Sequence, residues 1–263
     1  MKTPIMFFGK RESKKVPKNH GSSLAEKMAG LISCPALYFP EGTDKNAILL
    51  YYQYRVIQGK KKGFTPVLVP VSDRLLEYWE RRFSEGLPTK ELLATASSEK
   101  GKKFLSDRFR EYEQDYVKEY NETAENLIGK YSGAALKIGA FMELFAGNAK
   151  AEEIILFEVP VEHPWEVFAY LPFGGWNACP EQEEVISVCR YWYEKYEAVP
   201  SIVSLDTIEM TVPSPIGKES SIDAAKEHYA FCPDRVEQFT KYQTVSELAA
   251  SLSVSDVWYF WWD

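Results

Sequence analysis

A chain of 263 residues, 45% of them hydrophobic and 26% charged, is long enough to bury a substantial core and has the composition of a globular protein. Its formal net charge of −7 disfavours binding to nucleic acid and to anionic membranes, which are themselves negatively charged. No apolar run approaches the roughly eighteen residues of a membrane-spanning helix, and the run at residues 4–8 is too short for the core of a signal peptide. We therefore expect a cytoplasmic protein without nucleic-acid or membrane partners.

The cysteines agree with a reducing compartment. Cys34, Cys179, Cys189 and Cys232 include no CxxC pair, the spacing that is typical of redox motifs and of structural zinc sites. In a chain of this length, such thiols are most simply reduced and packed in the interior. We therefore expect no disulfide, no metal and no other cofactor.

A basic segment, residues 1–21, precedes the first periodic pattern. Its cations stand close together, with no aromatic residue between them: Lys10, Arg11, Lys14, Lys15 and Lys18. Because the rest of the chain is acidic, a flexible, solvated tail is favoured over a nucleic-acid-binding arm.

Residues 22–150 form the first predicted unit, which begins as helix, strand, helix, strand, helix. Ser22 or Ser23 is a suitable N-cap for the first helix, and Ser72 or Asp73 for the third. Gly63 follows three lysines and can adopt the left-handed conformation that ends a helix. The two strands are predicted at residues 36–39 and 66–71.

The rest of this unit, residues 89–146, is predicted to be mainly helical. An apolar stripe at helical spacing indicates one amphipathic helix, and its members are Leu105, Phe109, Tyr112, Tyr116 and Tyr120. A second apolar stretch, residues 134–145, is predicted to be a helix that either packs internally or docks a second subunit. Residues 148–150 form the junction to the next unit.

Residues 151–263 form the second predicted unit, either as a separate module or as part of one continuous domain with the first. The Gly-Gly pair at Gly174 permits a backbone path closed to other residues, and Pro180 suits the first turn of the following helix. Pro233 disfavours helical geometry in Cys232, so a helix must end there. Strands are predicted at residues 153–161, 166–173, 201–205, 208–212 and 257–263.

The last of these strands is predicted to be buried on both faces. Trp258, Phe260 and Trp262 would point to one side of the strand, and Tyr259 and Trp261 to the other. Because aromatic side chains on both faces favour burial, other elements are expected to pack against both faces of the strand. We therefore expect the strand to be structural and to gather the Gly-Gly turn and the end of the preceding helix into one neighbourhood.

These patterns predict an α+β fold with a mixed β-sheet, packed helices and a helical middle segment. Residues 37–40 and 65–69, with the helix between them, resemble residues 169–172 and 199–203 with theirs. The repeat predicts two strand–helix–strand units that contribute parallel crossovers to the sheet.

Five ordered blocks carry a resemblance to a known family. The blocks are GGWNACP from Gly174, RYWYEKYEA from Arg190, DTIEMTVPSP from Asp206, EHYAFCPD from Glu227 with Gln238 after it, and WYFWWD from Trp258. Together they cover about residues 165–263 and resemble the bacterial domain of unknown function family 4253. Two positions depart from the family pattern, since Glu197 and Phe239 stand where glycine is usual. The resemblance implies no activity, cofactor or partner.

Among the residues that could carry chemistry, His228, Cys232 and Asp234 form the most reactive combination. A cysteine needs a nearby imidazole or another positive group to become a thiolate at neutral pH, and His228 lies four positions before Cys232. The same spacing on a helix is more often core packing beside a hydrogen-bonded histidine. A hydrolase-type site therefore remains the alternative to a non-catalytic protein.

Two further ligand sets are weaker predictions. Cys179 with His228 and Cys232 could bind zinc, but the spacing differs from that of structural zinc sites. Asp206, Glu209 and Asp234 could bind magnesium or act as acid and base, although Asp206 is equally explained by a turn. The sequence has no GxGxxG, Walker, HExxH or GxSxG motif.

The remaining hypothesis is a binding or interaction protein with a protein partner. Tyrosine and tryptophan supply contact area at low entropic cost, and an acidic chain suits an immunity-like role in which it masks a basic partner. The predicted binding residues are Trp176, Asn177 and Asp206. The sequence favours this non-catalytic role over the hydrolase.

Overall fold

The structure is a computed structural model that describes residues 17–145 and 151–263. Most of the predicted basic tail, and the predicted junction, therefore lie outside the described residues. At the end of that tail, the backbone of Lys18 exchanges two hydrogen bonds with Tyr38, at 2.8 and 2.9 Å.

One mixed sheet of six strands forms the centre of the described part of the chain, in the order β1-β3-β2-β4-β5-β6. β2 and β4 are parallel and the other neighbours are antiparallel. The predicted α+β class is confirmed. The strands are β1 (Ala36–Phe39), β2 (Thr65–Pro70), β3 (Ile154–Val159), β4 (Val199–Val203), β5 (Thr207–Thr211) and β6 (Val257–Trp261).

Helices surround this sheet, and several begin or end where the sequence predicts. Ser22 and Ser72 each cap a helix by accepting a backbone N–H, and Gly63 ends one with a φ of 75°. The helices are α1 (Ser23–Leu31), α2 (Lys45–Lys62), α3 (Asp73–Ser84), α4 (Thr89–Thr95), α5 (Ser98–Tyr120), α6 (Ala124–Ile128), α7 (Met142–Phe145), η1 (Pro164–Ala169), α8 (Gln182–Tyr196), α9 (Ser221–Phe231), α10 (Asp234–Glu237) and α11 (Val245–Leu252).

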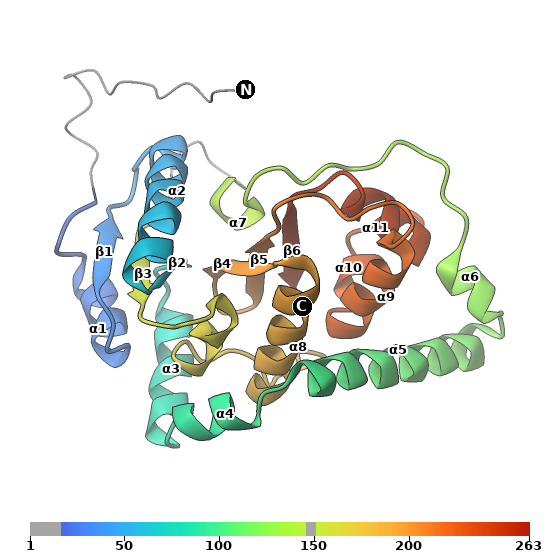
Figure 1. Cartoon of the computed structure of the whole chain (residues 1–263), viewed down its shortest axis with the longest axis horizontal. Coiled ribbons are helices and arrows are strands. Elements are labelled where there is room, and N and C mark those ends of the chain that lie inside the picture. The colour runs from blue at the N-terminus through green and yellow to red at the C-terminus, as the bar shows by residue number, and fades with distance from the viewer. Residues whose placement is uncertain (1–16, 146–150) are drawn as a thin grey trace.

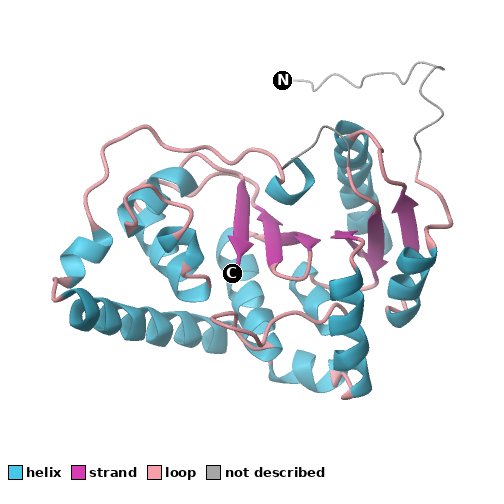
Figure 2. Ribbon diagram, turned by 180° about the vertical axis from the view of Figure 1, so that it is seen from behind, coloured by secondary structure: helices cyan, strands magenta, loops and turns pink. Residues whose placement is uncertain are grey.

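The sheet separates two hydrophobic clusters. Along β2, Val67 and Val69 belong to the larger cluster and Leu68 to the smaller one, as the alternation of a strand requires. The larger cluster lies under α3, α8 and α9, and the smaller one under α2 and α7. In Figure 1, α5 runs along the base of the molecule beneath α8 and α9, far from α2, and Figure 2 shows the same arrangement from behind.

The first predicted strand–helix–strand unit exists as β1, α2 and β2, but its strands are not neighbours. β3 lies between them and is antiparallel to both. The second predicted unit is wrong, because residues 166–173 contain no strand. Pro164 begins the 3₁₀ helix η1 there, and His163 and Glu166 form a capping box at its start.

The predicted helix at residues 134–145 is also wrong. Only α7 is helical, and we call the irregular segment before it, residues 129–141, the strap. Ile138, Phe141 and Leu144 enter the smaller cluster, while Ser251 and Ser255 hydrogen-bond the strap backbone. Backbone groups of the strap therefore form hydrogen bonds with distant side chains instead of the hydrogen bonds of a helix. The helical prediction is right for α4, α5 and α6.

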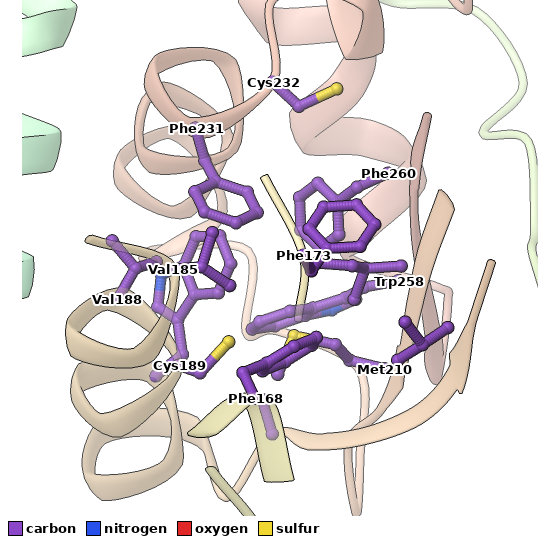
Figure 3. Packing of buried hydrophobic residues seen from close by; sticks show 14 of the residues in the cluster. Phe168, Phe173, Val185, Val188, Cys189, Met210, Phe231, Cys232, Trp258 and Phe260 are labelled. Carbon is purple, nitrogen blue, oxygen red and sulfur yellow. The ribbon is translucent and has the colours of Figure 1, made fainter. Parts of the chain in front are cut away.

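The aromatic strand is buried on both faces, as predicted. Trp258 and Phe260 are completely buried in the larger cluster, and Tyr259 packs in the smaller one. Figure 3 shows Trp258 and Phe260 close to Phe173 and Phe231. β6 is an edge strand of the described sheet, and α10 packs against it.

Candidate functional site

The predicted site residues fall into two groups in the structure. Trp176, Asn177 and Asp206 line one surface cleft. His228 and Cys232 are completely buried in the larger cluster. The cleft is therefore the candidate site, and the buried pair is considered after it.

We call this site the α3 cleft, after the helix that forms one of its walls. Its volume is about 510 Å³, and it opens at the surface. Four segments far apart in the sequence contribute: α3, the turn after Gly174, the β4–β5 turn and the end of β6. The lining residues are Arg74, Glu77, Tyr78, Arg81, Trp176, Asn177, Leu205, Asp206, Trp262 and Asp263.

The Gly-Gly turn positions Trp176. Gly174 and Gly175 have φ values of 95° and 83°, in the left-handed region that favours glycine. A side chain at Gly174 would overlap the carbonyl oxygen of Pro180. The Tyr78 hydroxyl donates to the Gly174 carbonyl at 2.9 Å, and its ring lies 5.2 Å from that of Trp176, edge to face. α3 and the turn are thus fixed to each other.

The aromatic strand completes the cleft. The Asn177 side-chain amide donates to the carbonyl of Asp263, and the backbone N–H of Trp262 donates to the carbonyl of Asp206 at 3.1 Å. Asn177 itself has a φ of 46°, which asparagine tolerates better than most residues. The predicted proximity of the Gly-Gly turn to the last strand is confirmed by these contacts.

The cleft carries charges of both signs. One oxygen of Asp206 accepts from the hydroxyls of Ser204 and Thr207, at 3.2 and 3.1 Å. On α3, Arg74 and Arg81 are exposed, and neither forms an ion pair with another described residue. The Arg81 guanidinium lies 5.5 Å from the centre of the Tyr78 ring.

Burial determines the protonation state of the Tyr78 side chain. It raises the pKa of Tyr78 to about 12, so the hydroxyl stays protonated and acts as a hydrogen-bond donor. The hydroxyl donates its proton in the hydrogen bond to the Gly174 carbonyl oxygen. We therefore assign Tyr78 a positioning role and no acid–base role.

His228 is packed among aromatic rings. The rings of Trp192, Trp258 and Phe260 lie 5.2, 4.4 and 4.8 Å from the His228 ring. Neither ring nitrogen has a hydrogen-bond partner among the described residues. Burial, with the nearby charge of Arg235, holds the pKa of His228 well below its usual range, so the imidazole is neutral.

Cys232 is equally unsuited to nucleophilic chemistry in this structure. Its thiol donates to the carbonyl of Trp261 at 3.1 Å, and burial raises its pKa to about 12. A thiolate is therefore strongly disfavoured at neutral pH. Asp234, the third member of the predicted set, instead accepts from Gln238 at 2.6 Å and from the backbone N–H of Asp263 at 3.3 Å.

The predicted carboxylate set is divided as well. Asp206 faces the α3 cleft, whereas Glu209 is completely buried and accepts the backbone N–H groups of Met142 and Glu143 at 2.8 and 2.7 Å. In the part of the chain that the structure describes, no group of three or more histidine, cysteine or acidic residues is arranged to hold a metal ion. Cys179, the third member of the predicted zinc set, is buried.

The sequence reasoning missed the most heavily hydrogen-bonded carboxylate, that of Glu227. It accepts from four side chains of α8 at 2.6–3.2 Å, and the donors are Tyr191, Trp192, Lys195 and Tyr196. A signal existed, because these four residues lie at i, i+1, i+4 and i+5 on one face of a helix. The α3 residues Arg74, Tyr78 and Arg81, at i, i+4 and i+7, were missed in the same way.

The comparisons with known proteins identify a family for the C-terminal part of the chain. The model of the family described as Domain of unknown function (DUF4253) matches residues 155–263, which confirms the resemblance. No curated protein and no solved structure matches the chain. In residues 17–145 and 151–263, no helix combines the length and the apolar character needed to cross a membrane.

Proposed function

We propose that this chain, whose C-terminal part matches the model of the DUF4253 family, is a non-catalytic binding protein that receives a protein partner in the α3 cleft. The observation that carries the proposal is the contrast between the two groups of predicted residues. Trp176, Asn177 and Asp206 face solvent together, whereas His228 and Cys232 lie in the core. Residues that must meet a ligand belong at the surface.

The composition of the cleft suits a protein partner. Aromatic and arginine side chains dominate the energetics of many protein interfaces, and here Trp176 stands beside Arg74 and Arg81. Most of the residues that line the cleft lie within the family match at residues 155–263, but those of α3 lie outside it. Part of the specificity is therefore expected from the segment that precedes the family module.

The form of binding that we favour is immunity-like masking of a basic partner. The net charge of −7 would speed encounter with such a partner through electrostatic steering. Asp206 and Glu77 would pair with its cations inside the cleft.

The alternative is a hydrolase that uses His228, Cys232 and Asp234. It requires α9 to open, because both His228 and Cys232 are completely buried. It also requires a thiolate, which burial opposes. Neither condition is met in this conformation, so we place this function second.

The test is affinity purification from the native host with matched baits. We expect one stoichiometric partner with the wild-type chain, and its loss with Trp176→Ala and with Glu77→Lys. Glu119→Lys is the control, because it makes the same charge change at an exposed position on α5. All baits should keep the wild-type melting temperature.

Two results would contradict the proposal. One is a partner that both cleft variants retain, or the absence of any stoichiometric partner. The other is rapid alkylation of Cys232 by iodoacetamide in the native protein, located by peptide mass spectrometry, which would favour the hydrolase.

A further inference from the structure

The helix α2 is apolar on two sides. Its inner side packs Ile48 and Tyr52 into the smaller cluster. On its outer side, Leu50, Tyr54 and Ile57 are 59%, 50% and 56% exposed. A helix that covers a sheet needs only one apolar face, so the outer side requires a separate explanation.

The outer residues follow the spacing of a helix–helix seam. Ala47, Leu50, Tyr54, Ile57 and Lys61 are separated by three, four, three and four positions. Alternating steps of three and four keep side chains along the line on which two helices pack. The seam therefore fits another helix better than it fits an irregular surface.

The charges at the two ends of α2 are opposite. Glu41 and Asp44 stand exposed at its start, and Lys60, Lys61 and Lys62 at its end. None of these five residues forms an ion pair with another described residue. Two antiparallel copies of α2 would bring each acidic end beside a basic end, and the helix dipoles would favour the same orientation.

We propose that the outer face of α2 is the interface of a homodimer, in which two copies of α2 pack antiparallel about a two-fold axis near Tyr54. In this arrangement, Leu50 of one protomer faces the partner's Ile57, and Tyr54 faces the partner's Tyr54. The charges of the surface are self-complementary, as a two-fold interface requires.

The size of the surface makes the dimer weak. A helix of 18 residues is about 27 Å long, and one helix face is smaller than the roughly 800 Å² per partner of a standard interface. The dimer should therefore form and dissociate with concentration in the micromolar range or above. The α3 cleft lies on the other side of the sheet from α2, so dimerisation leaves it open.

Sedimentation velocity over a concentration series tests the dimer. We expect a reversible monomer–dimer equilibrium for the wild-type chain and at least a tenfold rise in Kd for Leu50→Asp and Ile57→Asp. Leu136→Asp is the control, because Leu136 is 63% exposed but lies on the strap. Wild-type protein that stays monomeric up to millimolar concentration would overturn the proposal, as would a dimer that Ile57→Asp leaves intact.

Cysteine crosslinking tests the antiparallel geometry. Tyr54→Cys should form a covalent dimer on mild oxidation, and Leu50→Cys should crosslink efficiently only when it is mixed with Ile57→Cys. A parallel pair would instead crosslink Leu50→Cys with itself, and that result would overturn the arrangement. Leu136→Cys controls for random collision.

Discussion

At the scale of single residues, Glu209 is the most informative buried carboxyl group. Its carboxyl caps α7 through two backbone N–H groups, and the side chain has no exposed surface. Burial raises the pKa of Glu209 to about 8, although the two backbone hydrogen bonds and Arg235 act in the opposite direction. The residue attaches the end of the strap segment to the sheet.

The raised pKa of Glu209 predicts a pH-dependent stability. The folded protein holds a proton that the unfolded chain releases above about pH 4.5, so the stabilisation is complete below that pH and is lost as the pH rises through about 8. At about 1.4 kcal/mol per pKa unit, the loss is on the order of a few kcal/mol. Urea denaturation of the wild type and of Glu209→Gln at pH 6, 7, 8 and 9 measures it.

The comparison between these two proteins isolates the Glu209 contribution. His228 and the other titrating groups contribute equally to both proteins and cancel in the difference. We expect the free energy of unfolding to fall less steeply with pH in Glu209→Gln, and Glu119→Gln, at the exposed end of α5, to follow the wild type. Parallel pH profiles for the wild type and Glu209→Gln would show that Glu209 does not titrate in this range.

At the scale of elements, one carboxylate joins α8 to α9. Glu227 accepts four hydrogen bonds, including one from Lys195 at 2.6 Å, and its side chain is 15% exposed. Glutamine keeps the shape but loses the charge, so we expect Glu227→Gln to lower the free energy of unfolding by about 2 kcal/mol.

Urea denaturation measures the effect of Glu227→Gln on stability, and the ion pair of Glu194 with Arg190 supplies the control. Glu194 binds Arg190 at the surface of α8, and we expect Glu194→Gln to change the stability by less than about 0.5 kcal/mol. Equal effects of the two substitutions would mean that the Glu227 cluster adds nothing beyond an ordinary surface ion pair.

Local signals predicted the elements that depend on local contacts. Ser22 and Ser72 start helices because a cap needs only the next few residues. The signals failed at residues 134–145 and 166–173, where distant partners decide the backbone. In the strap, for example, Ser251 and Ser255 supply hydrogen bonds from more than a hundred positions away.

The candidate site was predictable in part for the same reason. Trp176 and Asn177 follow the Gly-Gly turn, Asp206 lies in the β4–β5 turn, and turns often carry binding residues. Arg74 and Arg81 share one face of a predicted helix, but only the folded structure shows that this face lies beside the Gly-Gly turn. Glu197 ends α8 in the left-handed conformation, with a φ of 54°, which glycine would adopt at lower cost.

At the scale of the whole molecule, the last strand joins the parts of the larger cluster. Trp258 contacts the rings of α8 and α9, and Trp262 contacts Phe173 and Phe231. We predict that deletion of residues 258–263 abolishes cooperative unfolding, because the larger cluster loses completely buried side chains.

Differential scanning calorimetry with circular dichroism checks this prediction. Deletion of Asp263 alone is the control, since it leaves β6 intact and removes only exposed hydrogen bonds. A truncated chain that melts cooperatively near the full-length temperature would show that the rest of the cluster is sufficient.

The position of β3 also constrains how the protein is made. β1 and β2 emerge early from the ribosome, yet each forms its antiparallel ladder only with β3, which is translated after the whole helical middle of the chain. Until β3 is translated, the apolar strands β1 and β2 have unpaired backbone edges. Unpaired strand edges favour misassembly. Chaperone capture of β1 and β2 during translation is therefore expected to decrease once residues 154–159 have left the exit tunnel.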